Sequence, residues 1–136
     1  MPDFAEVESI VDQGELLALI VRSEFSKPGI SFFTEPDFSQ QLGFIKHPAG
    51  KQITPHVHKR VERTIVYTQE TLFIRRGLLR VDFYSEAQQF LYSRTLRPGD
   101  VVLLIKGGHG FCVIEDVEMF EVKQGPYAGD GDKTLF

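Results

Sequence analysis

The chain has one cysteine and no long apolar run among its 136 residues, and both absences narrow its class. Because Cys112 is the only cysteine, no disulfide can form within one chain, and folding does not need an oxidising compartment. No stretch approaches the roughly 20 apolar residues that span a bilayer, and the run 16–21 is too short for a signal core. We therefore expect a cytoplasmic protein that does not enter a membrane. We also predict a buried strand at 16–21 and a buried Cys112 side chain.

A large excess of charge of one sign is also missing. Fifteen basic residues against nineteen acidic ones give a formal charge of -4, so we expect no broad attraction to a nucleic acid or to an anionic membrane. Hydrophobic residues make up 42% and charged residues 25%, which is ordinary for a soluble globular protein. The length suits one domain with a packed core, spanning residues 1–136.

The chain shows no convincing amphipathic helix and no internal repeat. Short apolar or alternating runs instead recur between turn signals, a pattern that favours an all-β sandwich or barrel. The predicted strands are 16–21, 30–34, 42–46, 63–67, 71–75, 79–84, 90–95, 101–105 and 118–123.

Glycines and polar residues separate the predicted strands. We expect Gly50, Gly77 and Gly99 at turns that need a positive φ angle or a close approach of the backbone. The polar residues 85–89 predict the tip of a hairpin. Glycines and a proline in 125–132 predict a looping tail.

Two of the four histidines, His56 and His58, form a His-x-His pair. On a β-strand, residues two apart share a face, so both imidazoles can reach one ion. Glu70 and His109 follow along the chain. Imidazole and carboxylate together suit Fe, Mn, Ni, Cu or Zn, whereas Ca or Mg prefers oxygen ligands alone. The pattern predicts a divalent transition metal and leaves its identity open.

Two segments resemble the motifs of the cupin superfamily. The sequence GKQITPHVH at 50–58, with Glu70 followed by six residues and then Gly77, resembles the first motif. The sequence RPGDVVLLIKGGHG at 97–110 resembles the second. The resemblance implies a double-stranded β-helix, or jelly-roll barrel, with additional N-terminal strands at about 1–42, a barrel core at about 43–123 and a tail at 124–136. It also implies a metal site in the barrel formed by His56, His58, Glu70 and His109.

The chain departs from the first motif in the spacing between the second histidine and the glutamate. Eleven residues, 59–69, separate His58 from Glu70 where the motif has three or four, so a loop is inserted. Glu62 stands at the short spacing and is the rival ligand, but no glycine follows it at the expected place, so Glu70 is preferred. Glu70 could also be an ordinary strand-edge carboxylate paired with Arg75 or Arg76.

The predicted site leaves room for a ligand beside the metal. Four protein ligands on an ion that accepts six leave two positions for water or substrate. We therefore predict a metal-binding cupin that acts on a small polar metabolite such as a carbohydrate derivative, as a metal-dependent isomerase or oxygenase. Tyr67 and Lys123 are the acid or base candidates. The tail, with Lys123 to Tyr127 and Asp132–Lys133, more weakly resembles cupins associated with sugar-nucleotide and polysaccharide biosynthesis.

Two other functions stay open. One is a non-catalytic module that binds a small molecule, and the other is a metal-free sugar-nucleotide isomerase or epimerase in which histidine is the base. Cupins commonly form pairs, and the resemblance therefore implies a homodimer.

Overall fold

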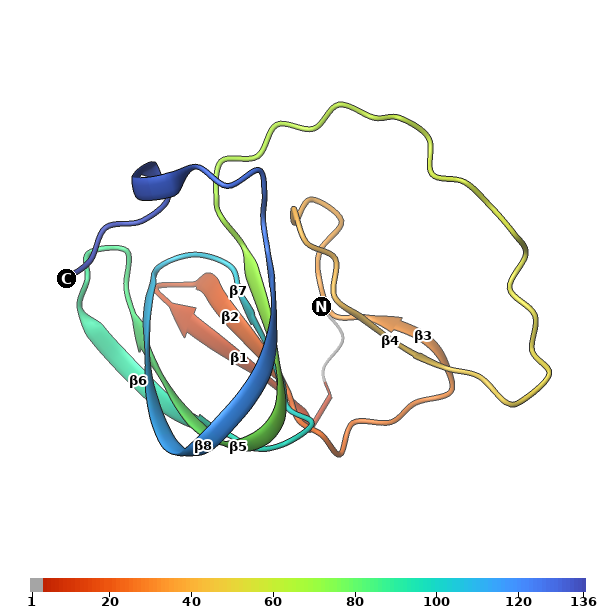
Figure 1. Cartoon of the computed structure of the whole chain (residues 1–136), viewed down its shortest axis with the longest axis horizontal. Helices are drawn as coiled ribbons and strands as arrows, with labels where there is room; N and C mark the ends of the chain where they lie inside the picture. The colour runs from red at the N-terminus through yellow and green to blue at the C-terminus, as the bar shows by residue number, and fades with distance from the viewer. Residues whose placement is uncertain (1–3) are drawn as a thin grey trace.

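The computed structural model describes residues 4–136, and antiparallel β-strands dominate it (Figure 1). The predicted N-terminal part, about 1–42, includes residues 1–3, which lie outside the described residues. Within 4–136 there is one short 3-10 helix, Gly129–Gly131, and no α-helix, so the all-β prediction is confirmed. In the same part of the chain, no helix has the length and apolar character needed to cross a bilayer. The strands are β1 (Val7–Asp12), β2 (Glu15–Val21), β3 (Gly29–Phe32), β4 (Gly43–Lys46), β5 (Glu70–Tyr84), β6 (Phe90–Leu96), β7 (Val101–Leu104) and β8 (Gly108–Lys123).

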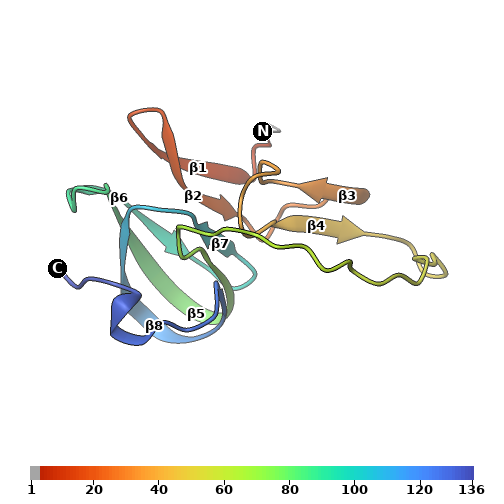
Figure 2. The same cartoon turned by 90° about the horizontal axis from the view of Figure 1, so that it is seen from above.

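Six of these strands form one curled sheet in the order β1-β2-β7-β5-β6, with β8 on the other edge of β5. The first part of β5, Glu70–Phe73, pairs with β7, and its last part, Leu79–Tyr84, pairs with β6. β8 pairs with β5 along nearly its whole length. Figures 1 and 2 show the result as a half-barrel, with the two-stranded sheet of β3 and β4 beside it. The half-barrel is open because the outer edge of β8 pairs with no described strand.

Gly77 lies in the middle of β5, where the strand bends. Its φ angle is +86°, and the pairing register with β8 shifts on both sides of it, between Ile74 and Leu79. Irregular pairing and glycine together increase the twist and bend of a strand. The predicted strands 71–75 and 79–84 are therefore one continuous strand. The prediction of a positive φ at Gly77 is confirmed, but no chain reversal occurs there.

The core has two parts, one on each face of β2 and β7. Ala18 and Ile20 belong to the cluster inside the half-barrel, whereas Leu19 and Val21 pack outside it with Phe25 and other residues of the segment that leads to β4. A strand that is buried on both faces reads as a continuous apolar run and not as an alternating one. This explains the run 16–21, and the prediction of a buried strand there is confirmed.

Asp100, immediately before β7, is fully buried and holds the segment after β2. One carboxylate oxygen accepts a hydrogen bond from the Ser23 backbone N–H at 2.8 Å. The other accepts from the Arg97 backbone N–H at 2.8 Å and from the Arg22 guanidinium at 3.1 Å. A buried charge is tolerated where such donors surround it. Asp100 therefore joins two segments that are far apart in the sequence.

Several sequence predictions need correction. The predicted strand 63–67 is wrong, because these residues are exposed and have no sheet partner. The predicted strand 118–123 is only the last six of the sixteen residues of β8. The strand β1 was not predicted because its apolar residues are interrupted by acidic ones. The Cys112 side chain is exposed, since β8 has a neighbour on one edge only. The hairpin tip is confirmed, with the backbone N–H of Ser85 donating to Gln89 O at 2.8 Å.

Candidate functional site

Residues 47–69, which we name the arm, connect β4 to β5 without any helix or strand. Figure 1 shows this segment as the yellow-green trace that sweeps away from the half-barrel. Every residue from 48 to 68 is exposed, and Val57 and Val66 keep 89% and 86% of their surface in water. Large apolar side chains exposed to this extent along one segment are unusual on a surface that contacts nothing. The arm therefore has apolar surface available for contact with another part of a protein.

Three of the predicted site residues, His56, His58 and Tyr67, lie on the arm. The two imidazole rings have centroids 5.3 Å apart. His56 Nδ1 lies 2.8 Å from the carbonyl oxygen of Thr54, which can only accept, so Nδ1 carries the hydrogen, and in the neutral ring Nε2 has the lone pair. This is the usual orientation of a metal-binding histidine. The Tyr67 ring has the Lys106 ammonium 5.7 Å from its centroid.

Glu70 and His109 lie near opposite ends of the ladder between β5 and β8. Glu70 pairs with Lys123, whereas His109 pairs with Phe83, thirteen positions further along β5 (83 minus 70). In a flat strand these positions would be about 43 Å apart, at about 3.3 Å per residue. Glu70 Oε2 nevertheless lies 3.8 Å from His109 Nε2. The curl of the β5–β8 ribbon brings these two side chains together.

The Glu70 carboxyl lies beside a second carboxyl. Burial, and a hydrogen bond with the Glu121 carboxyl, raise the pKa of Glu70 to about 7, although Lys123 and Lys133 oppose the shift. Burial also lowers the pKa of His109, an effect that Lys133 increases and Glu121 opposes. Around neutral pH, therefore, the Glu70 carboxyl is partly protonated, and the His109 imidazole is neutral.

The tail passes over this site. The Lys123 ammonium lies 3.6 Å from a carboxylate oxygen of Asp132 and 5.6 Å from the centroid of the Tyr127 ring. Further on, the Phe136 ring packs edge-on against Tyr84, with centroids 5.1 Å apart. Lys123 is the last residue of β8, and Tyr84 of β5 pairs with the first residue of β8. The tail therefore extends from one end of the β5–β8 ribbon to the other, and the site residues lie at these two ends. The prediction of a looping tail is confirmed, since no strand follows Lys123.

Sequence reasoning did not identify Glu121, Asp132 and Lys133 as site residues. One signal for Glu121 was available, because it stands two positions before Lys123 and so shares its face of the strand. Asp132 and Lys133 had no such signal beyond the weak resemblance of the tail, since a loop has no fixed periodicity.

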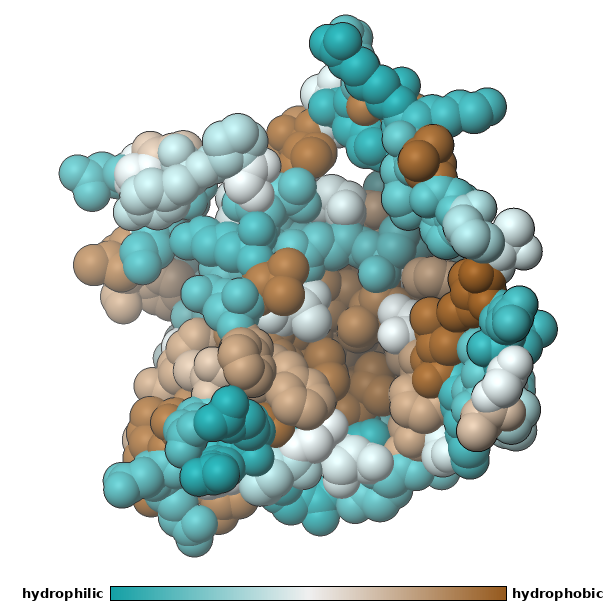
Figure 3. Space-filling model, turned by 45° about the vertical axis from the view of Figure 1, so that its right-hand side comes forward, coloured by the Kyte–Doolittle hydropathy of each residue, from teal (hydrophilic) through white to brown (hydrophobic). Residues whose placement is uncertain are grey.

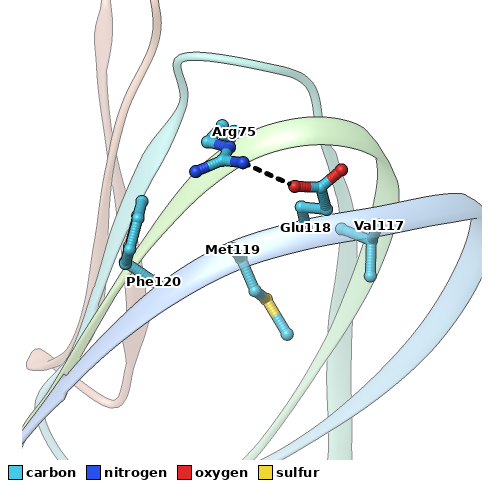
Figure 4. A pocket seen from close by; sticks show the side chains of 5 residues that line it. All are labelled: Arg75, Val117, Glu118, Met119 and Phe120. Atoms are coloured by element: carbon cyan, nitrogen blue, oxygen red, sulfur yellow. Dashed lines mark hydrogen bonds and ion pairs between the residues drawn. The ribbon is translucent and has the colours of Figure 1, made fainter.

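Arg75 and Arg76 do not pair with Glu70. Their guanidinium groups lie 2.8 Å and 3.5 Å from the carboxylate of Glu118. Figure 4 shows the first of these pairs in a shallow groove, where Arg75 also lies over the Phe120 ring. The alternative assignment of Glu70 as their ion-pair partner is therefore wrong.

The positions of Glu70 and His109 are compatible with a shared metal ion. Two ligand atoms that each lie about 2.1 Å from one ion can be at most about 4.2 Å apart, and the observed separation is 3.8 Å. Within residues 4–136, however, no group of three or more His, Cys, Asp or Glu side chains is arranged to hold a metal. The structure brings together two pairs, His56 with His58 and Glu70 with His109. The set of four ligands stays a prediction, and the rival Glu62 is exposed on the arm.

Hydrophobic side chains are exposed at the surface of the molecule, and Figure 3 shows brown ones gathered in a depression with hydrophilic borders. Apolar side chains on the inner face of β8 are exposed too. Phe111 and Val113 of β8 pair with the fully buried Val81 and Leu79, yet they are 41% and 55% exposed. These side chains are exposed because no strand among the described residues pairs with the outer edge of β8.

Comparison with known proteins gives no further assignment. A scan against protein-family models, a search of curated proteins and a search of solved structures each found no match. The functional argument therefore rests on the residues and their geometry.

Proposed function

We propose that the chain is a metal-binding protein of the cupin type, in which Glu70 and His109 hold a divalent transition metal together with His56 and His58 of the arm. The observation that carries this proposal is the 3.8 Å separation of Glu70 and His109, two residues that the curl of β5 and β8 brings together. Their donor atoms, and the free Nε2 of His56, are of the kinds that Fe, Mn, Ni, Cu or Zn accepts.

In this proposal the arm adds a strand to the open edge of β8. An unpaired strand edge is a ready template for another extended segment. If residues near 52–58 paired with the start of β8, His56 and His58 would share its inner face with His109, and Val57 would point outward. The added strand would cover Phe111 and Val113, which are now partly in water. The half-barrel would then close into a double-stranded β-helix.

We propose a small polar metabolite, such as a carbohydrate derivative, as the substrate or ligand. A bound divalent ion would polarise a carbonyl or hydroxyl oxygen of such a molecule. The Glu70 carboxyl, with its pKa of about 7, can hold a proton, and Lys123 stands beside Glu70 in the ladder. Lys123 is therefore better placed than Tyr67, whose ring contacts Lys106, to act as an acid or base.

A metal-free isomerase or epimerase is the second candidate. It is favoured by the pKa of about 7 for Glu70 and by the neutral imidazole of His109 beside it, because a general acid or base works best with a pKa near the working pH. Turnover of a nucleotide sugar that survives a strong chelator would support this candidate over the metal-dependent one.

The test of the metal proposal is elemental analysis after loading with Fe(II), Mn, Ni or Zn. We expect near-stoichiometric metal in the unaltered protein and loss of metal in His56→Ala and Glu70→Gln, because each change removes a ligand. The matched controls are His47→Ala and Glu62→Gln, which should keep the metal. Circular dichroism establishes that each variant is folded. No metal under any loading, or full metal in both site variants, would contradict the proposal.

A further inference from the structure

Two ammonium groups lie beside the candidate metal site. Lys123 is the ladder partner of Glu70, and its ammonium lies 3.6 Å from Asp132. Lys133 comes next in the tail, and its positive charge acts on both Glu70 and His109. Within residues 4–136, no carboxylate lies within 4.0 Å of the Lys133 ammonium, and the residue is exposed. Lys133 is therefore the cation of this site that a ligand can reach.

The charge balance of the site depends on the metal. Three carboxylates, Glu70, Glu121 and Asp132, face two ammonium groups, Lys123 and Lys133. The sum is one negative charge when all three carboxylates are ionised, and a divalent cation would turn it into one positive charge. A site with a net positive charge favours an anion.

Asp132 adds a separate requirement. Its side chain is only 10% exposed, and its Oδ2 is the atom that lies 3.6 Å from the Lys123 ammonium, just beyond hydrogen-bond distance, so this buried oxygen accepts no hydrogen bond within the described residues. Buried polar atoms in native proteins nearly always have a hydrogen-bond partner. The hydroxyl group of a ligand is a donor of the right kind.

We propose that the ligand of this site is a small hydroxylated anion, whose carboxylate or phosphate group contacts Lys133 and whose hydroxyl donates to Asp132. This inference rests on the proposed function and names the substrate class for it. The tail is then part of the binding site, and Lys133 is its specificity-determining residue. Lys123, held by Asp132, supports the same anionic group from β8.

The experiment is calorimetric titration of the full chain, with and without bound Ni, using three probes. Glycerate carries a carboxylate, glycerol 3-phosphate carries a phosphate, and erythritol is neutral. We expect at least one of the anions to bind more tightly than erythritol, and the tighter anion identifies the group. Lys133→Met should weaken anion binding at least about tenfold, because a charge-assisted hydrogen bond is lost. Lys133→Arg should restore most of the binding, and Asp132→Asn should weaken glycerate binding by a smaller factor.

The matched control is Lys27→Met, which removes the same charge in the segment between β2 and β3 and should leave anion binding unchanged. Equal binding of erythritol and both anions, no anion binding at all, or unchanged anion binding in Lys133→Met would overturn the inference. Metal content is measured on the same samples. Bound metal without anion binding refutes this inference alone, whereas Lys133-dependent anion binding in a chain that takes up no metal under any loading refutes the metal proposal alone.

Discussion

Replacing Gly77 by alanine should destabilise the protein more than the same change at another glycine of similar backbone angle. A Cβ at position 77 would lie 2.0 Å from the carbonyl oxygen of Asp116 and 2.9 Å from Cα of Val117. Both are backbone atoms of β8, so the two strands must move apart. The positive φ costs about 1–2 kcal/mol for an L-residue, and overpacking costs about 1–3 kcal/mol more. The free energy of unfolding should therefore fall by about 2–5 kcal/mol.

The matched control is Gly14→Ala. Gly14 has a φ angle of +78°, but no atom lies within 4 Å of a Cβ built there, so only the backbone cost of about 1–2 kcal/mol applies. Urea denaturation followed by circular dichroism measures both variants. Since domains of this kind are stable by about 5–15 kcal/mol, the difference is measurable. Equal losses of stability in the two variants would refute the close approach of β5 and β8 at Gly77, and with it the account of how the ribbon curls.

Two further changes test the framework around the site. Asp100→Ala should lower the free energy of unfolding by about 3 kcal/mol, because two backbone N–H groups and Arg22 lose their acceptor. Urea denaturation measures this change, and a loss below about 1 kcal/mol would argue against the hydrogen-bond network around Asp100. For Glu8, burial raises the pKa, but hydrogen bonds from Arg94 and Arg22 outweigh it and leave the pKa below the ordinary value of 4.5. The stabilisation from Glu8 is thus present above pH 4.5 and is lost as the pH falls below it. Glu8→Gln should lower the melting temperature at pH 7 and have a smaller effect at pH 3, and an equal effect at both pH values would speak against the ion pairs.

The division between what the sequence predicts and what the fold decides is clear in β5. The alternation at 79–84 and the apolar residues at 71–75 predict two strands, and Gly77 predicts a break between them. The backbone of Gly77 does have a positive φ angle, but β5 continues through it without a chain reversal. Local sequence specifies where a strand bends and cannot specify by how much. The bend depends on where Asp116 and Val117 of β8 lie, and these residues are far along the chain.

The sequence by itself determined the all-β class, the buried strand at 16–21 and the residue types that point to a metal. These follow from local periodicity, composition and donor chemistry, which a short window of residues contains. Only the tertiary structure decided that Glu70 meets His109, that the Glu121 carboxyl lies against Glu70 and that the tail brings Asp132 and Lys133 to the same place. Such contacts depend on strand register and on the curl of a sheet, which arise from pairings between residues that are distant in the chain.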